Sequence, residues 1–395
     1  MGLKEKISIE RALERLASFQ CRHYKKVIVA ALILTVFLGY GATELHFRGN
    51  IAKEMPQDLP VFVLQDKIAS KFRGEEFMII AVCLDKETSA KNVPRDIRDP
   101  KVIASVVELH ERLETEPSIE RVQSVAPVFQ GGVPDDIEGV KKKLASVPGS
   151  ESFLNDDFSI MLVYASPIAG LSEEKVKEAT DIIQNDIDSI TKPAGVTYKI
   201  TGIAPLIIEV LRLMREDMVF TTLVAAVIIF GLLVLLERSF TKGFLVFLPL
   251  IFAVIWTFGT MGFLGIPVSI STVMIGAVII GLGVEYGIFM VSRYYEERSH
   301  GNTTRDALRI AVSNIGASTF GSAATTTAAF FALTLSVMPM IQHLGETLAL
   351  GIIFCWLAAV VVNPCFIVFE ERIEARKLAD GLRKWVGKAK KCEIS

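Results

Sequence analysis

Residues Val268–Arg298 read VSISTVMIGAVIIGLGVEYGIFMVSRYYEER, and the interpretation of the whole chain starts from this stretch. Its first part, Val268–Val284, carries no charge, Glu285 and Tyr286 then stand between apolar neighbours, and charges resume only at Arg293. An apolar run of this length can cross a bilayer. An ionisable residue inside a span is costly, so a functional role is the first hypothesis. The alternative is a carboxyl group that hydrogen-bonds a neighbouring helix for packing alone.

Composition places the chain among membrane proteins. It has 395 residues, of which 51% are hydrophobic, and those residues are concentrated in blocks. The net charge of -2 hides a division: residues 46–217 hold 21 basic and 29 acidic residues, a charge of -8, which leaves +6 for the remainder. Basic residues favour the cytoplasmic side. We therefore expect 46–217 outside the cell membrane and both termini inside, with no nucleic-acid partner.

Several functional classes lack their sequence signals. Five cysteines occur, and only Cys83 lies within 46–217, so that segment cannot form an internal disulfide. The five histidines are scattered without metal-ligand spacing, and no phosphate-binding loop of the ATPase type is present. We expect no metal, no cofactor and no enzyme activity. The first apolar run comes too late for a cleavable signal peptide.

Six membrane spans are predicted. Residues 1–26 form a cytoplasmic segment with an amphipathic helix at Ile7–Gln20, which lies along the inner membrane surface or is a solvated leader. Residues 27–45 are the first span, 218–368 hold five more, and 369–395 form a basic cytoplasmic tail. The five later spans are predicted at 218–236, 243–264, 268–295, 317–336 and 348–368.

Residues 46–217 alternate between strand and helix patterns. Strands are predicted at 76–84, 119–125, 158–165 and 196–201, and helices at 100–114, 135–146 and 172–190, the last capped by Ser172. This order is typical of a ferredoxin-like βαββαβ domain, an antiparallel sheet with two helices on one face. The predicted fold is thus an α-helical membrane protein with six transmembrane helices (1+5) and an extracytoplasmic α+β domain.

The fourth span is predicted to carry small residues on one side and an acidic residue on another. Gly276, Gly283 and Gly287 are spaced so that another helix can approach closely. Glu285 lies two residues from Gly283 and faces another side, so we expect a helix that is buried all round. Burial disfavours the charged form of a carboxyl group, which suits a residue that takes up and releases protons.

The fifth span is unusually polar. Thr319, Ser322 and Thr326 share one face, and Ser318 and Thr325 lie on a neighbouring one. Such hydroxyls can simply bond their own helix backbone. Next to a buried carboxylate they could also hold water or steady its two protonation states.

These motifs resemble the RND (resistance–nodulation–division) superfamily, in particular its MMPL-type branch for hydrophobic and amphiphilic molecules. The order of one span, an outer domain and five spans is that of one RND repeat. The resembling segments are GLGVEYGIFMVSRYYEE at 281–297, TTTAAFFAL at 325–333, HLGETLALG at 343–351 and MPQDLP at 55–60. The resemblance implies proton-driven export, with Glu285 and Tyr286 as the proton relay. The branch usually has Asp in place of Glu285, and two repeats in one chain where this chain has one.

Two functions follow from this resemblance. The first is a proton-coupled transporter of lipids or other amphiphiles that works as a homodimer or higher homo-oligomer, in contact with membrane lipids. Its two fourth spans would meet at a two-fold axis, with Glu285 of one copy near Tyr286 of the other. The second is a non-transporting module, such as a SecD/SecF-like protein-export accessory or a sterol-sensing-type regulator. A titrating group in mid-membrane favours the transporter.

Overall fold

The computed structural model divides into two compact units, Met1–Pro56 with Leu213–Ser395, and Gln57–Arg212. The structure describes residues 3–49, 54–56, 58–64, 67, 77–85, 93–167 and 173–373. The predicted cap Ser172 and most of the predicted tail lie outside these ranges. Each unit is described by itself.

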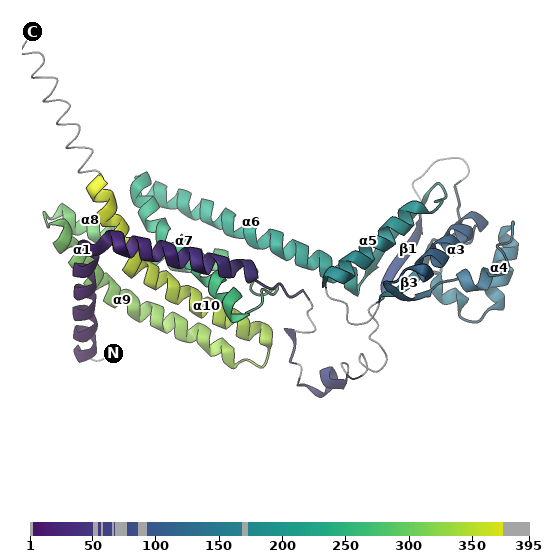
Figure 1. The fold of residues 1–395 in the computed structure, drawn as a ribbon, viewed down its shortest axis with the longest axis horizontal. Helices are drawn as coiled ribbons and strands as arrows, with labels where there is room; N and C mark the ends of the chain where they lie inside the picture. The colour runs from purple at the N-terminus through teal and green to yellow at the C-terminus, as the bar shows by residue number, and fades with distance from the viewer. Residues whose placement is uncertain are drawn as a thin grey trace, which may run out of the picture. The chain divides into compact units, whose positions relative to one another are not determined.

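The first unit is a helical bundle (Figure 1). Its helices are α1 (Leu3–Gly41), α6 (Ile203–Glu237, which begins in the other unit), α7 (Phe240–Leu264), α8 (Ile275–Ser299), α9 (Thr304–Ala332) and α10 (Pro339–Leu357). Five described segments are long and apolar enough to cross a membrane: Glu10–Glu44, Ile203–Glu237, Phe240–Leu264, Ile275–Ser299 and Pro339–Ile373. The predicted span at 317–336 falls in α9, whose hydroxyl residues lower its hydropathy. The count of six therefore stays a prediction.

The amphipathic arm and the first span belong to one helix, α1, which bends sharply in Figure 1. His23 lies at the bend, with non-helical backbone angles of φ -121° and ψ 24°. Leu13 and Ala17 of the arm are buried against α9 and the end of the segment Pro339–Ile373, which contains α10 and is called the α10 segment below. In the structure the arm is docked on the bundle, so it is not a solvated leader.

The fourth spanning helix begins later than predicted. α8 starts at Ile275, seven residues after the predicted start at Val268. Val268 instead forms a parallel β-bridge with Phe47, and Thr272 accepts a hydrogen bond from the Ser269 amide at 2.7 Å. These bonds are incompatible with a continuous helix from Val268. The apolar residues before Ile275 therefore form a loop instead of the first turns of α8. The next helix also differs from the prediction: α9 begins at Thr304, 13 residues before the predicted start of the fifth span at 317.

The α10 segment contains a π-helical turn at Ala358–Val362. Pro364 follows it, and proline has no N–H to donate to the carbonyl of Val360, four residues earlier. The side chain of Gln20 supplies that donor: its Nε2 lies 2.8 Å from the Val360 oxygen and 3.1 Å from the Val361 oxygen. Gln20 is fully buried. The arm of α1 is therefore fixed to the bundle by a hydrogen bond that completes a proline-broken helix.

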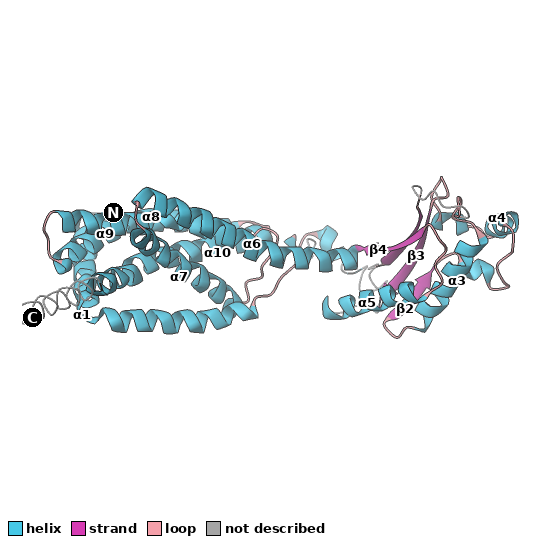
Figure 2. Cartoon of the chain, turned by 90° about the horizontal axis from the view of Figure 1, so that it is seen from above, coloured by secondary structure: helices cyan, strands magenta, loops and turns pink. Residues whose placement is uncertain are grey.

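The second unit is built on a four-stranded sheet (Figure 2). Its strands are β1 (Met78–Leu84), β2 (Ile119–Gln123), β3 (Ile160–Pro167) and β4 (Val196–Gly202), in the order β2-β3-β1-β4. All neighbouring strands are antiparallel. Helices α3 (Pro100–Thr115), α4 (Ile137–Ser146) and α5 (Glu173–Ser189) connect them. The order of strands and helices along the chain and the antiparallel pairing agree with the prediction, while the assignment to the ferredoxin-like fold stays a prediction.

One face of this sheet carries the core of the second unit. Met78, Ile80 and Val82 alternate along β1 with no exposure to solvent. They pack with the buried sides of α3 and α5, including Val106 and Ile183. Alternation in strands and a spacing of three to four residues in helices produce one continuous apolar layer. This explains why the strand and helix positions could be predicted to within a few residues.

Candidate functional site

The glycines of α8 face other helices of the bundle. A Cβ on Gly287 would lie 2.5 Å from the carbonyl oxygen of Val246 on α7. A Cβ on Gly283 would collide with Cys355 on α10, and one on Gly276 with Thr222 on α6. Three of the four neighbouring helices thus approach α8 along this stripe.

Glu285 lies on a different side of α8 and is exposed within the single chain. Leu282 and Phe289, one turn before and after it, are 39% and 50% exposed. The expectation that α8 is buried all round is therefore wrong for one chain. The neighbouring helices cover the glycine side of α8 and leave the Glu285 side exposed. We call Leu282, Glu285 and Phe289 the open face.

Tyr286 points the other way, into the bundle. Its side chain is 2% exposed and packs in an apolar cluster with Leu250, Ile279 and Cys355. A Tyr286 ring buried in its own chain cannot reach Glu285 of a second copy without repacking that cluster. The expected cross-pair between Glu285 and the other copy's Tyr286 therefore does not fit this structure.

Ser322 of α9 links the two residues within one chain. Its Oγ donates to Glu285 Oε1 at 3.5 Å, a long hydrogen bond, and it also interacts with the phenol of Tyr286. Ser322 is exposed on the same side as Glu285. A hydroxyl that touches both members of the proposed relay can follow a change in the charge of either.

The remaining hydroxyls of α9 bond mostly to their own helix. Thr319 is buried and donates to the Ile315 oxygen at 2.6 Å, and Thr325 donates to the Ser322 oxygen at 2.9 Å. Ser318 donates to Ile315 at 3.1 Å. Thr326 is half-buried. Of the predicted supporting residues Thr319, Ser322, Thr325 and Thr326, the structure brings Ser322 to the carboxylate, while Thr319 and Thr325 bond their own helix backbone, as the alternative predicts.

A second feature, an apolar pocket, lies on the far side of α9 and was not predicted from the sequence. An apolar pocket of about 400 Å³ opens between α9 and α10, lined by Phe320, Phe331 and Trp356 among others. The indole Nε1 of Trp356 and the hydroxyl of Thr327 are buried there without a hydrogen-bond partner in the described part of the chain. No group of acidic, histidine or cysteine side chains among the described residues could hold a metal ion.

Comparisons with known proteins identify a family and relatives that this chain resembles. The sequence profile of the MMPL family matches residues 54–390. The chain is 34% identical over 372 residues to "Putative membrane protein MJ1562" of Methanocaldococcus jannaschii, covering 93% of this chain and 96% of that protein. It is 24% identical over 222 residues to "Siderophore exporter MmpL5" of Mycobacterium tuberculosis, covering 54% of this chain and 23% of that protein. The match spans nearly all of the first relative and under a quarter of the second.

Proposed function

The chain belongs to the MMPL family, and from that premise we propose that it is a proton-driven exporter of lipids or other hydrophobic molecules, working as a homodimer of single repeats. The relatives include a protein named as a siderophore exporter. The helical bundle and its apolar, membrane-length helices suit a multi-pass transporter. The outer domain and the termini are proposed to lie on opposite sides of the membrane.

The observation that carries the proposal is the exposure of Glu285 on the open face. A carboxyl group facing lipid at mid-membrane costs several kcal/mol or more when charged. The cost falls if the carboxyl group is neutral, or if a second surface covers it and supplies hydrogen bonds. A proton relay at an interface needs a residue that changes charge and a partner surface that covers it. Glu285 on the open face meets the first need and leaves room for the second.

A second copy of the chain is the proposed cover. In a two-fold arrangement the open face of one copy meets the open face of the other. Each Glu285 would then lie near the exposed hydroxyls of α9, Ser318, Ser322 and Thr325, in its own or the other copy. This revised pairing keeps Tyr286 in its own bundle, where the structure places it.

Proton flux tests the relay. In proteoliposomes that enclose a pH-sensitive dye and contain a fluorescent phospholipid, Glu285→Gln should reduce both proton flux and lipid export to the level of protein-free vesicles. The variant should fold and dimerise normally, because Gln keeps the shape and removes only the titration. The matched control is Glu296→Gln, an exposed carboxylate near the end of the same helix that pairs with Arg293. Undiminished export by Glu285→Gln would refute the relay.

Ser322 gives a finer test of the same site. Ser322→Ala removes one hydrogen bond to Glu285, and bonds to charged groups are worth about 1.5–3 kcal/mol. Because this bond is long, we expect a loss of flux of less than about tenfold. Ser318→Ala is the control, since Ser318 is one turn away and bonds only its own backbone among the described contacts. Equal losses in the two variants would speak against a specific role for Ser322.

Cross-linking tests the dimer independently of transport. Leu282→Cys should form a disulfide-linked dimer in membranes under mild oxidation. Leu235→Cys, at a 75% exposed position on α6, should not. The parent chain reports what its native cysteines contribute. A dimeric, well-folded protein that moves neither protons nor lipid would support the non-transporting alternative.

A further inference from the structure

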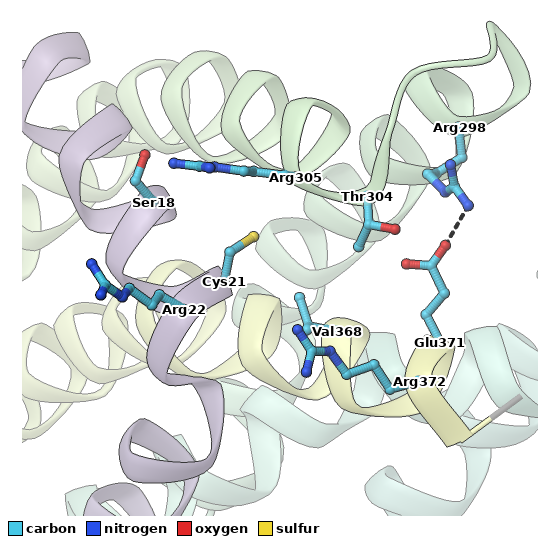
Figure 3. A pocket seen from close by; sticks show the side chains of 9 residues that line it. All are labelled: Ser18, Cys21, Arg22, Arg298, Thr304, Arg305, Val368, Glu371 and Arg372. Carbon is cyan, nitrogen blue, oxygen red and sulfur yellow. Dashed lines mark ion pairs between the residues drawn. The ribbon is translucent and has the colours of Figure 1, made fainter. Parts of the chain in front are cut away.

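A cavity of about 630 Å³ lies at one end of the bundle, away from Glu285, where the arm of α1 meets the start of α9 and the end of the α10 segment (Figure 3). Four arginines line it, Arg22, Arg298, Arg305 and Arg372, together with Glu371. They come from four different parts of the chain. The fold therefore gathers these charges, since nothing in the local sequence places them together.

Among the described residues that line the cavity, the one carboxylate is already engaged. Glu371 pairs with Arg298 at 2.5 Å and accepts a hydrogen bond from the Tyr294 hydroxyl at 2.6 Å. Figure 3 shows this pair at one edge of the cavity, apart from the other arginines. Glu371 therefore neutralises Arg298, and within the described part of the chain the other three guanidinium groups have no carboxylate bound to them.

Those three side chains lie to the left of the Arg298–Glu371 pair in Figure 3, and all three are exposed to solvent. Arg372 is stacked 4.8 Å from the ring centre of Tyr24, and Arg22 and Arg305 have no hydrogen bond or ion pair within the described ranges. The neighbouring acid Asp306 accepts a hydrogen bond from Thr303, the cap of α9. Like charges brought together repel each other unless an anion joins them. The two hydroxyl groups on the cavity wall are already engaged: Ser18 donates to the Glu14 oxygen at 3.0 Å, and Thr304 is hydrogen-bonded to Glu371. The arginines therefore remain as the donors for an anion.

We propose that this cavity binds a phosphate group. Guanidinium groups match phosphate oxygens with paired hydrogen bonds, and a surplus of arginines at a membrane protein's basic side is a known type of headgroup site. The phosphate can be that of a lipid headgroup or free in solution. A lipid source has support from α1: just past the cavity this helix exposes Val29, Ile33 and Val36, so an acyl chain could lie along it.

The site is separate from Glu285, and the inference does not rest on the proposed transport. It concerns a ligand held at one end of the bundle, where α1 docks through Gln20. A bound phosphate would join the arm of α1 to α9 and α10, so we expect binding to stabilise the arm.

Native mass spectrometry of the delipidated full-length protein tests the site with three probes: phosphatidic acid, phosphatidylcholine and inorganic phosphate. We expect one phosphatidic acid to bind about tenfold more tightly than phosphatidylcholine. The double variant Arg22→Gln/Arg305→Gln should weaken that binding by about tenfold or more. Arg22→Lys/Arg305→Lys keeps the charge without the paired donors and should lie between. The control Arg15→Gln/Arg309→Gln removes equal charge from exposed positions on the same two helices outside the cavity.

The outcomes are distinct. Binding of inorganic phosphate alone, lost in the first double variant and kept in the control, supports the site with a soluble ligand. Loss of phosphatidic acid binding in the same pattern supports the lipid. Equal weakening by both double variants would mean general charge attraction and would overturn the proposal, as would wild-type binding of every probe by Arg22→Gln/Arg305→Gln. The unchanged elution volume of each variant shows that it is folded.

Discussion

At the scale of single residues, Gln20 makes a contact that could not be predicted from the residues around it in the sequence. It replaces the missing N–H of Pro364 at the Val360 carbonyl. Gln20→Leu fills similar space but leaves that buried acceptor unpaired, which costs about 1–3 kcal/mol. We expect a lower thermal unfolding midpoint in detergent. Gln130→Leu, an exposed glutamine in the second unit, is the control. An unchanged midpoint for Gln20→Leu would show that the bond contributes nothing to stability.

Asp96 of the second unit gives a pH-dependent prediction. Burial raises the pKa of its carboxyl group, but hydrogen bonds from the Arg98 guanidinium and amide outweigh burial and hold the pKa below its usual value. A depressed folded pKa stabilises the fold above the unfolded value of about 3.9, and the stabilisation fades as the pH falls through the folded pKa.

Asp96→Asn should therefore destabilise the protein at pH 7 and differ little from wild type in acid. Unfolding midpoints of both proteins, measured from pH 7 down to about pH 3, should converge. The exposed Asp181 on α5 gives the control, Asp181→Asn. A gap between Asp96→Asn and wild type that stays constant over this range would contradict the assigned cause.

At the scale of elements, sequence patterns predict where helices and strands lie better than where they begin or what covers them. The strands of the sheet are found because apolar residues alternate. The start of α8 is missed because it depends on Val268 pairing with Phe47, a residue far away in the chain. The exposure of Glu285 is missed for a related reason: spacing shows that it faces away from Gly283, but it cannot show which faces have neighbours. The arginine cavity has no local signal at all.

The glycine stripe of α8 gives an element-scale prediction. Gly287→Ala would press a methyl group onto the Val246 carbonyl, a backbone atom that cannot turn aside. Overpacking of this kind costs about 1–3 kcal/mol. Gly231→Ala on α6 has no atom within 4 Å of the added carbon and should be neutral or slightly stabilising. The thermal unfolding midpoint of Gly287→Ala should fall, while that of Gly231→Ala should rise slightly or stay unchanged. Equal shifts of the two midpoints would refute the close contact.

At the scale of the whole molecule, the charge division predicts how the chain crosses the membrane. Asp135→Cys, exposed near the start of α4, should react in intact cells with a maleimide that cannot cross membranes. Ser299→Cys, at the end of α8, should react only after the cells are opened. Each variant is compared with the parent chain, whose own cysteines set the background. Labelling of Asp135→Cys only from the cytoplasmic side would reverse the proposed orientation.

The bond between Gln20 and Val360 also sets an order of events in time. A ribosome makes Gln20 of the arm 340 residues before it makes the acceptor, Val360. Until then the arm has no site to occupy, because the π-helical turn that receives it does not exist. This bond therefore forms only after the segment around Val360 has been made. Protection of residues near 20 from proteolysis would therefore report that the segment around Val360 has been made and folded.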